Sequence, residues 1–335
     1  MNGRFLVAAF SFLAIAVLAP GPAAGQGQAW TPPRTPEGRP DIQGTFTFST
    51  ITPLQRPAAL EGKETLNAEE AAAFEASENK RQNRDLFDPE KGAPSAGYAP
   101  RAQGGVLSYN EFWYERGSQL TEDKRTSLIV DPPDGRIPFT EAARQKNAER
   151  TKKSNSGFAD SYTDRSLADR CIMGFNSGPP MISGAYNNNL QILQTAEYVV
   201  VVNEMVHNAR IIPTDGRPHG KIRQFAGDSR GRWEGDTLVV ETTNFLRETS
   251  LTGSTADTHL VERFTRVDPD TITYEFTVKD PTSYTRSWSA SMPLQRTDAQ
   301  VFEYACHEGN YGLHGIMAGA RAKDKAEAEA AKKKQ

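Results

Sequence analysis

The stretch from His259 to Lys279, HLVERFTRVDPDTITYEFTVK, decides the fold. Asp268-Pro269-Asp270 divides it into two runs, and these residue types favour a turn, because Pro presets φ and Asp tolerates a left-handed backbone. In the second run the apolar residues recur at every other position, at Ile272, Tyr274, Phe276 and Val278. A period of two is typical of a strand with one buried face. The stretch therefore predicts an antiparallel hairpin with one dry face.

The same pattern extends outward from this hairpin. Strand-like runs separated by turn residues fill the chain from Leu190 to Glu308, and Thr126–Val130 has the same form upstream. The predicted runs are Leu190–Thr195, Tyr198–His207, Arg210–Pro213, Ile222–Ala226, Thr237–Phe245, His259–Val267, Thr271–Lys279, Tyr284–Met292 and Gln300–His307. Their connections are too short for crossover helices, so the sheet should be antiparallel. A sheet with one dry face must close on itself or meet a second layer, which predicts a mainly β fold: an antiparallel up-and-down barrel or a sandwich.

The sequence before this region differs in composition. Trp30 to Pro57 is rich in Pro, Thr and Arg, and only Thr45–Thr50 is strand-like. Ala68–Arg84 predicts a surface helix with Asn67 as its N-cap, and Glu141–Lys153 predicts a second polar helix. Gly174–Asn189 is rich in turn residues. The expected organisation is a signal peptide (1–25), an extended arm with a surface helix (26–120), an antiparallel β domain (121–312), and a short helix with a basic tail (313–335).

Residues 1–25 match a secretory signal. Arg4 is followed by an apolar run from Phe5 to Ala19, and small residues at Ala23 and Gly25 suit cleavage before Gln26. The alternative is a retained anchor helix, but an apolar run of about 15 residues is short for a hydrocarbon core of about 30 Å. The later sequence contains no apolar stretch of spanning length. The mature protein is therefore expected in the periplasm or outside the cell, without a transmembrane segment.

The charge and motif content narrow the function classes. The 39 Lys and Arg residues are balanced by 42 Asp and Glu residues, giving a net charge of −3, so no nucleic-acid partner is expected. The hydrophobic fraction of 37% still allows a core. The chain has no phosphate loop, no dinucleotide-binding glycine motif and no G-x-S-x-G elbow. We therefore expect no cofactor; the sequence leaves the oligomeric state open.

Cys171 and Cys306 are the two cysteines of the chain. In an oxidising compartment a single pair is most simply a disulfide. A catalytic thiol and a metal thiolate are the alternatives, but the chain has no C-x-x-C spacing to support them.

The first functional hypothesis is an exported enzyme that uses acid–base chemistry on a small molecule inside a β-barrel pocket, as a lyase, hydratase or hydrolase. His207 would transfer the proton, because imidazole titrates near neutral pH, and Glu204 or Asn203 would orient it. Arginine side chains would stabilise an anionic substrate group. The candidate catalytic residues are His207, Glu204, Arg210, His259, Glu262 and Arg263, and the candidate substrate-binding residues are Asn203, Tyr284, Arg286 and Trp288. Alternation places Arg286 on the apolar face, with Tyr284 and Trp288.

Other interpretations of the same residues remain open. The charged side chains of the β region could form structural ion pairs or face outward. His207, His259 and His307 could ligate a metal with Glu204, Glu262 or Glu303, but no known metal-binding spacing is present, so no metal is predicted. The protein could instead be a non-catalytic binder, with an apolar or aromatic ligand held by Tyr284, Trp288 and Met292. An envelope structural or assembly protein is the third possibility.

Several runs resemble a family of uncharacterised exported bacterial proteins, described as hypothetical proteins. They include NEMVHNARIIPTDGRPH, GDSRGRWEGDTLVVETTNF, HLVERFTRVDPDTITYEFTVKDP and EYACHEGNYG, with RTSLIVDPPDGRIP and DRCIMGFNSGPPM upstream. The resemblance covers most of the mature chain. It implies a lipocalin-type barrel with added arms, and it implies no catalytic residues.

Overall fold

The computed structural model describes residues 30–86, 111–155, 159–246, 251 and 253–333. The chain divides into two units, Met1–Thr31 and Pro32–Gln335. The predicted signal peptide lies outside the described residues, and all contacts below belong to the second unit. No helix among the described residues is both long enough and apolar enough to cross a membrane.

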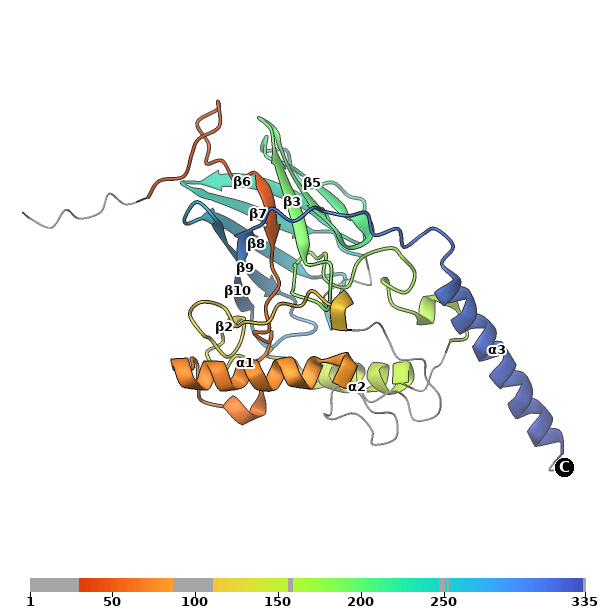
Figure 1. The fold of residues 1–335 in the computed structure, drawn as a ribbon. Coiled ribbons are helices and arrows are strands. Elements are labelled where there is room, and N and C mark those ends of the chain that lie inside the picture. Colours follow the sequence, from red (N-terminus) through yellow and green to blue (C-terminus); the bar gives the residue numbers. More distant parts are fainter. Residues whose placement is uncertain (1–29, 87–110, 156–158, 247–250, 252, 334–335) are drawn as a thin grey trace, which may run out of the picture. The chain divides into compact units, whose positions relative to one another are not determined.

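Nine strands form one continuous antiparallel sheet in the order β5-β4-β3-β1-β10-β9-β8-β7-β6 (Figure 1). Their bounds are β1 (Gly44–Thr47), β3 (Asn189–Gln194), β4 (Tyr198–Asn203), β5 (Ala209–Pro213), β6 (Asp228–Glu234), β7 (Thr237–Thr243), β8 (His259–Arg266), β9 (Thr271–Lys279) and β10 (Trp288–Arg296). A further strand, β2 (Ile129–Asp131), pairs with β10 outside this path. Strand β1, from the N-terminal arm, lies between β3 and β10 and so joins two groups of later strands.

The two end strands of the sheet come close enough to make it a nearly closed barrel. A Cβ atom on Gly231 of β6 would lie 2.9 Å from Thr214 Cγ2 and 3.1 Å from Cγ2 of Ile212 in β5. Only a residue without a side chain allows this approach. The predicted class, a mainly β antiparallel barrel, is confirmed.

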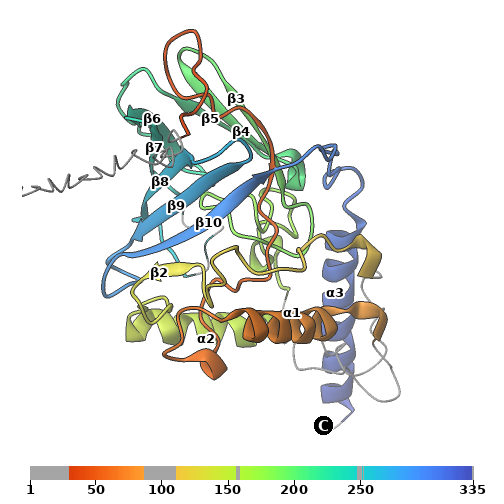
Figure 2. The same ribbon diagram turned by 60° about the vertical axis from the view of Figure 1, so that its left-hand side comes forward.

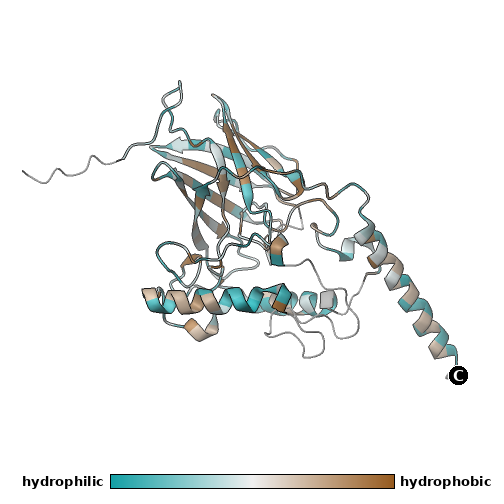
Figure 3. Cartoon of the chain, viewed as in Figure 1, coloured by the Kyte–Doolittle hydropathy of each residue, from teal (hydrophilic) through white to brown (hydrophobic). Residues whose placement is uncertain are grey.

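Alternating burial defines the inside of the barrel. In β9, Ile272, Tyr274, Phe276 and Val278 are buried, whereas the residues between them are partly or fully exposed. Apolar and polar residues also alternate along several other strands, as the colouring in Figure 3 shows. The inward side chains form one hydrophobic core, whose largest fully buried members include Trp288, Tyr274, Phe46 and Phe264.

The loop Gly174–Asn189 contributes to this core. Met181 is fully buried in it, and its backbone N–H donates to Tyr274 Oη at 3.1 Å. The Asn203 amide donates to Ser177 O at 3.1 Å, which ties the loop to the end of β4. The loop therefore plugs the barrel core, although its sequence predicts only turns.

Three α-helices accompany the barrel among the described residues: α1 (Ala68–Gln82), α2 (Glu141–Asn155) and α3 (Tyr311–Lys332). Asn67 and Glu70 form a reciprocal capping box at the start of α1, and Ala71 is buried, so the predicted surface helix is confirmed. Helices α1 and α2 lie beyond the end of the barrel at which β2 pairs with β10 (Figure 2). Short 3₁₀ turns complete the described elements: η1 (Ala58–Leu60), η2 (Arg84–Leu86), η3 (Glu111–Trp113), η4 (Tyr162–Asp164) and η5 (Met205–His207).

Some predicted strand positions were wrong. Ile222–Ala226 contributes only an isolated bridge at Gln224, whereas β6 follows it at Asp228–Glu234, where no strand was predicted. The turn before β6 includes Gly227, which has a φ of 69°. The run Gln300–His307 is not a strand, and β10 begins at Trp288, four residues later than expected.

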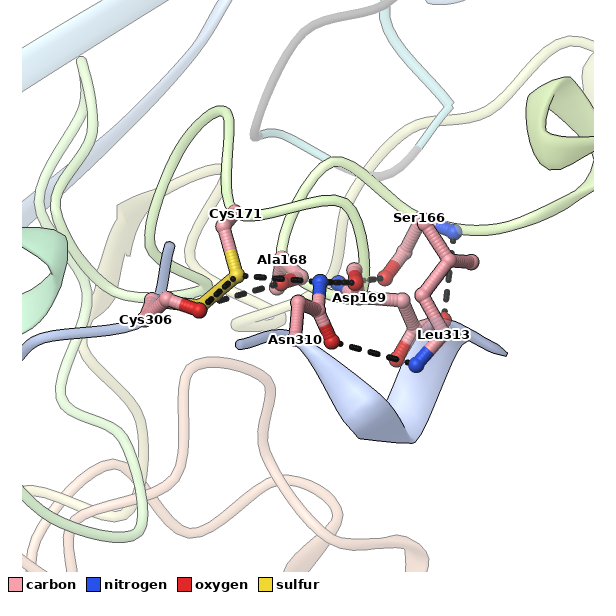
Figure 4. The surroundings of a disulfide bond; sticks show 7 residues. All are labelled: Ser166, Ala168, Asp169, Cys171, Cys306, Asn310 and Leu313. Atoms are coloured by element: carbon pink, nitrogen blue, oxygen red, sulfur yellow. Dashed lines mark hydrogen bonds between the residues drawn. A yellow bond between two sulfur atoms is a disulfide. The ribbon is translucent and has the colours of Figure 1, made fainter. Parts of the chain in front are cut away.

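The C-terminal segment is fastened by a disulfide between Cys171 and Cys306, whose Cα atoms lie 5.5 Å apart (Figure 4). Beside it, Asn310 Nδ2 donates to Asp169 O at 2.9 Å, while Asn310 Oδ1 accepts from Leu313 N at 3.1 Å and caps α3. The predicted pairing is therefore confirmed. Helix α3 continues to Lys332 and is much longer than the short helix expected there.

Candidate functional site

A buried ionic cluster lies inside the barrel. Arg210 projects inward from β5, where its Nη1 and Nη2 atoms donate to the two carboxylate oxygens of Glu262 in β8, at 2.5 and 2.9 Å. Tyr274 Oη in β9 donates to Glu262 Oε1 at 2.7 Å and accepts from the Met181 backbone N–H. Glu262 and Tyr274 are fully buried, and Arg210 is 7% exposed. The strand alternation places all three side chains on the inner face.

The Glu262 carboxylate affects the pKa values of both neighbouring groups. Burial alone would lower the pKa of Arg210, but the adjacent Glu262 carboxylate raises it above its usual value. Burial raises the pKa of the Tyr274 hydroxyl, and the neighbouring Glu262 charge raises it further. Because each group already has hydrogen-bond partners within the cluster, the arrangement is that of a structural ion pair. The catalytic roles predicted for Arg210 and Glu262 stay predictions.

Tyr284 and Trp288, predicted to bind substrate, lie in the same core. Their rings meet edge to face with centroids 5.9 Å apart, and Trp288 makes a similar contact with Phe276 at 5.7 Å. Tyr284 is 3% exposed and Trp288 is fully buried. Burial raises the pKa of the Tyr284 hydroxyl, with the charge of Asp280 as the next cause. Protein side chains therefore surround the positions at which a barrel ligand was expected.

The turn after β4 carries three more candidate residues. Strand β4 ends at Asn203, and the chain then forms η5, in which His207 N donates to Glu204 O at 3.1 Å. The Glu204 carboxylate is buried and accepts from Asn189 Nδ2 at 2.9 Å and from Phe302 N at 3.0 Å. It therefore anchors two neighbouring segments, whereas it was expected to orient the His207 ring.

The backbone of η5 is strained. Val206 and His207 have φ values of 58° and 40°, a left-handed conformation that is rare for residues other than Gly, especially for a β-branched one. Such strain costs of order 1–3 kcal/mol per residue and persists only where the surrounding contacts enforce it. The Glu204 anchor and the β4–β5 pairing are two such contacts.

Two of the three histidines proposed as metal ligands come together. The rings of His207 and His307 have centroids 6.0 Å apart with a tilt of 52°, and both residues are exposed. His259 lies on the outer face of β8, where its Nε2 atom is 2.5 Å from Glu241 Oε1. Glu262 is inside the barrel with Arg210. The three histidines and Glu262 therefore do not form a single metal-binding cluster, and that hypothesis was wrong.

Two predicted arginines lie on the surface. Arg263, on the outer face of β8, donates to Glu234 Oε2 at 3.0 Å, with both side chains 41% exposed. Arg286 was expected on the apolar face, but β10 begins two residues later, so strand alternation does not apply to it. Its guanidinium pairs with Asp131 at 2.6 Å and is 54% exposed. The predicted inward placement of Arg286 was wrong.

A cleft of about 310 Å³ lies outside the barrel. Five separate parts of the chain line it: Thr50–Leu54, the C-terminal part of α1, Arg116, Leu128, and Ile182–Ala185. Its apolar lining consists of Ile51, Pro53, Leu54, Leu128 and Ile182, and its charged or amide side chains are Glu78, Arg81, Gln82 and Arg116. None of the residues predicted to form the site belongs to it.

Internal hydrogen bonds hold the walls of this cleft in place. Thr50 N donates to Ser183 Oγ at 3.1 Å, which joins two walls, and Arg116 Nη2 donates to Gln82 O at 2.9 Å, which joins a third wall to α1. Arg116 also lies 4.3 Å from the centroid of the Tyr114 ring and pairs with Glu111. The cleft is therefore a preformed concave surface with both apolar and charged parts.

Sequence reasoning missed the cleft because its walls are far apart in the chain. The available signal was local and weak: Thr45–Thr50 was strand-like, and the Gly174–Asn189 loop held Met181 and Ile182 among turn residues. Neither feature indicates that the two segments meet.

Comparisons with known proteins identify no family. No family model matches the chain, and no curated protein matches it. Among solved structures, the chain is similar to a point mutant of the fluorescent protein UnaG, with 11% sequence identity and a TM-score of 0.23 over 39% of this chain and 86% of that one. At this level of similarity the match supports no functional argument, and the fold assignment depends on the strand order alone.

Proposed function

We propose that the protein is a non-catalytic binding protein for a small organic molecule, and that the ligand occupies the cleft between α1 and the Ile182–Ala185 segment. The observation that carries the proposal is the cleft itself, a hollow of about 310 Å³ lined by both apolar and charged side chains. This volume lies at the lower end of the range of about 300–1,000 Å³ found for small-molecule sites. The barrel interior is less suitable because its aromatic and ionic side chains already contact one another.

The lining favours a ligand with an apolar body and one acidic group. Leu54 and Ile182 supply apolar surface, and Arg81 and Arg116 supply two guanidinium groups. Arg81 already pairs with Glu78 at 2.7 Å and Arg116 pairs with Glu111, so an anionic ligand would share both cations with the protein's own carboxylates. The electrostatic preference should therefore be moderate.

The test is a fluorescence titration of the purified mature chain with 8-anilinonaphthalene-1-sulfonate, which combines aromatic rings with an anion. We expect saturable binding that weakens at least tenfold in Gln82→Trp, because the indole fills the cleft. Lys80→Trp is the matched control: it introduces the same ring two residues earlier on α1, at an exposed position outside the cleft lining, and should bind as the wild type does. Equal binding by wild type and Gln82→Trp would refute the assignment.

Export also belongs to this proposal. The Cys171–Cys306 disulfide supports an oxidising compartment, because such bonds persist outside the cytosol. N-terminal sequencing of the protein recovered from the cell envelope or medium should begin at Gln26. A chain that retains Met1 would contradict cleavage.

A further inference from the structure

We propose that His207 and His307 form a binding site for one divalent transition-metal ion, termed here the two-histidine site. Their rings lie side by side, with centroids 6.0 Å apart, although the residues are 100 positions apart in the sequence. This site is separate from the cleft, whose lining includes neither histidine.

The distance between the rings suits a shared metal ion. A metal-to-nitrogen bond of about 2.0–2.1 Å puts the ion about 3.2 Å from the centre of each imidazole ring. Two ligating rings then have centroids about 5.2 Å apart at a tetrahedral angle and about 6.4 Å apart when the nitrogens lie on opposite sides of the ion. The observed 6.0 Å falls between these limits. A shared ion also requires one nitrogen of each ring to point toward it, and both side chains are exposed.

The protein fixes the backbone on both sides of the site. His307 directly follows Cys306, whose disulfide to Cys171 fastens that segment. His207 lies in the strained turn η5, where Glu204 O accepts from its backbone N–H. The carboxylate of the same Glu204 accepts from Phe302 N, in the segment that carries His307. One buried glutamate thus joins the two histidine-bearing segments.

The strain at η5 is the second observation that indicates a site. A left-handed Val206 followed by a left-handed His207 is an unfavourable way to connect β4 to β5, because two-residue turns built from Asn and Gly make the same connection at lower cost. Here the unfavourable turn places an imidazole beside His307. Strained backbone of this kind clusters at functional positions.

The ligand chemistry defines the class of ion. Among the described residues no group of three or more His, Cys, Asp or Glu side chains is arranged to hold a metal, so the protein supplies two imidazoles and water completes the coordination. Neutral imidazole suits Zn²⁺, Ni²⁺ and Cu²⁺, and Cu²⁺ should bind most tightly of these. Mg²⁺ and Ca²⁺ prefer oxygen ligands and should not compete.

The experiment uses the mature chain without an affinity tag. Zn²⁺ binding is measured by calorimetry, and the nitrogen ligands of bound Cu²⁺ are counted by electron paramagnetic resonance. We expect one ion per chain with two imidazole nitrogens, and at least a tenfold loss of Zn²⁺ affinity in His207→Gln and in His307→Gln, each leaving one nitrogen at this site. His314→Gln, a change at another exposed histidine seven residues from His307, is the matched control and should bind like the wild type.

A second variant tests the role of the backbone. Replacing both cysteines with serine frees the segment that carries His307, so Zn²⁺ affinity should fall in the otherwise wild-type chain but hardly change in the His207→Gln background. Because both histidines are exposed, the glutamine variants should unfold at the wild-type temperature. Undiminished affinity in His207→Gln and His307→Gln, or an equal loss in His314→Gln, would overturn the proposal.

Discussion

Replacing Arg210 with Met tests the buried ion pair most directly. Glu262 has three hydrogen bonds to side chains in the cluster, two from Arg210 and one from Tyr274 Oη. The Arg210→Met variant keeps much of the side-chain length but leaves a fully buried carboxylate with only the tyrosine. Breaking one side of a buried pair costs about 3–5 kcal/mol, which is a large part of the ~5–15 kcal/mol that stabilises an ordinary domain.

The other variants of the cluster separate charge from packing. Tyr274→Phe keeps the ion pair but removes one hydrogen bond to Glu262 and leaves the Met181 N–H without an acceptor, so it should cost about 1–3 kcal/mol. The triple variant Arg210→Met/Glu262→Met/Tyr274→Phe removes both charges, and the Met181 N–H is then the main unpaired group. It should be more stable than Arg210→Met alone, although it carries two more changes.

Guanidinium denaturation followed by far-UV circular dichroism and tryptophan fluorescence gives the free energies of unfolding. Arg263→Met is the matched control, because that arginine pairs with Glu234 on the surface, where an ion pair contributes little to stability. An Arg210→Met variant within 1 kcal/mol of the wild type would refute the buried pair. A triple variant less stable than Arg210→Met would refute the argument that the unpaired charge dominates the cost.

Three further predictions concern other parts of the barrel unit. Replacing Cys171 and Cys306 with serine should lower the free energy of unfolding by about 2–5 kcal/mol, because the bond closes a loop with a sequence separation of 135; an unchanged denaturation midpoint would contradict this. Gly231→Val should cost about 1–3 kcal/mol by forcing β6 away from β5, with faster amide exchange in both strands, and wild-type exchange would argue against their close approach. The hydrogen bond from His259, with the nearby positive charges, holds the pKa of Glu241 below its usual 4.5. The ionised Glu241 carboxylate therefore stabilises the folded state above pH 4.5, and this stabilisation is lost as the pH falls through the lowered pKa. Glu241→Gln should therefore cost at most about 1 kcal/mol at pH 5.5 and nothing at pH 2.5, as urea denaturation at the two pH values would show; a cost that persists at pH 2.5 would exclude this cause.

The barrel was predictable wherever burial follows a period of two. Along β8 and β9 the alternation correctly separates the inward Glu262 and Tyr274 from the outward His259 and Arg263. Strand β6 was missed because its sequence, DSRGRWE, has almost no apolar alternation. Its central Gly231 allows the close approach of β6 to β5. That approach is a tertiary contact, so it produces no pattern in the local sequence.

The candidate site was predictable only in part for the same reason. The sequence selected His207, but its nearness to His307 depends on a disulfide and on the Glu204 contact to Phe302 N, both of which join distant segments. The prediction for Arg286 was wrong because β10 begins four residues later than expected, so Arg286 lies outside the strand. Met181 reaches the core through the path of its loop, which turn residues alone do not determine.

The strand order has a geometric consequence at the junction of β5 and β6. Eight successive antiparallel steps separate these two strands, and an even number of reversals leaves both chains running in the same direction. The two strands therefore cannot pair in an antiparallel manner, so the barrel cannot be closed by the antiparallel hydrogen bonding that joins its other strands. Mechanical or thermal opening of the barrel should begin at the junction of β5 and β6. Inserted sequence should be tolerated best in the segment that connects these two strands.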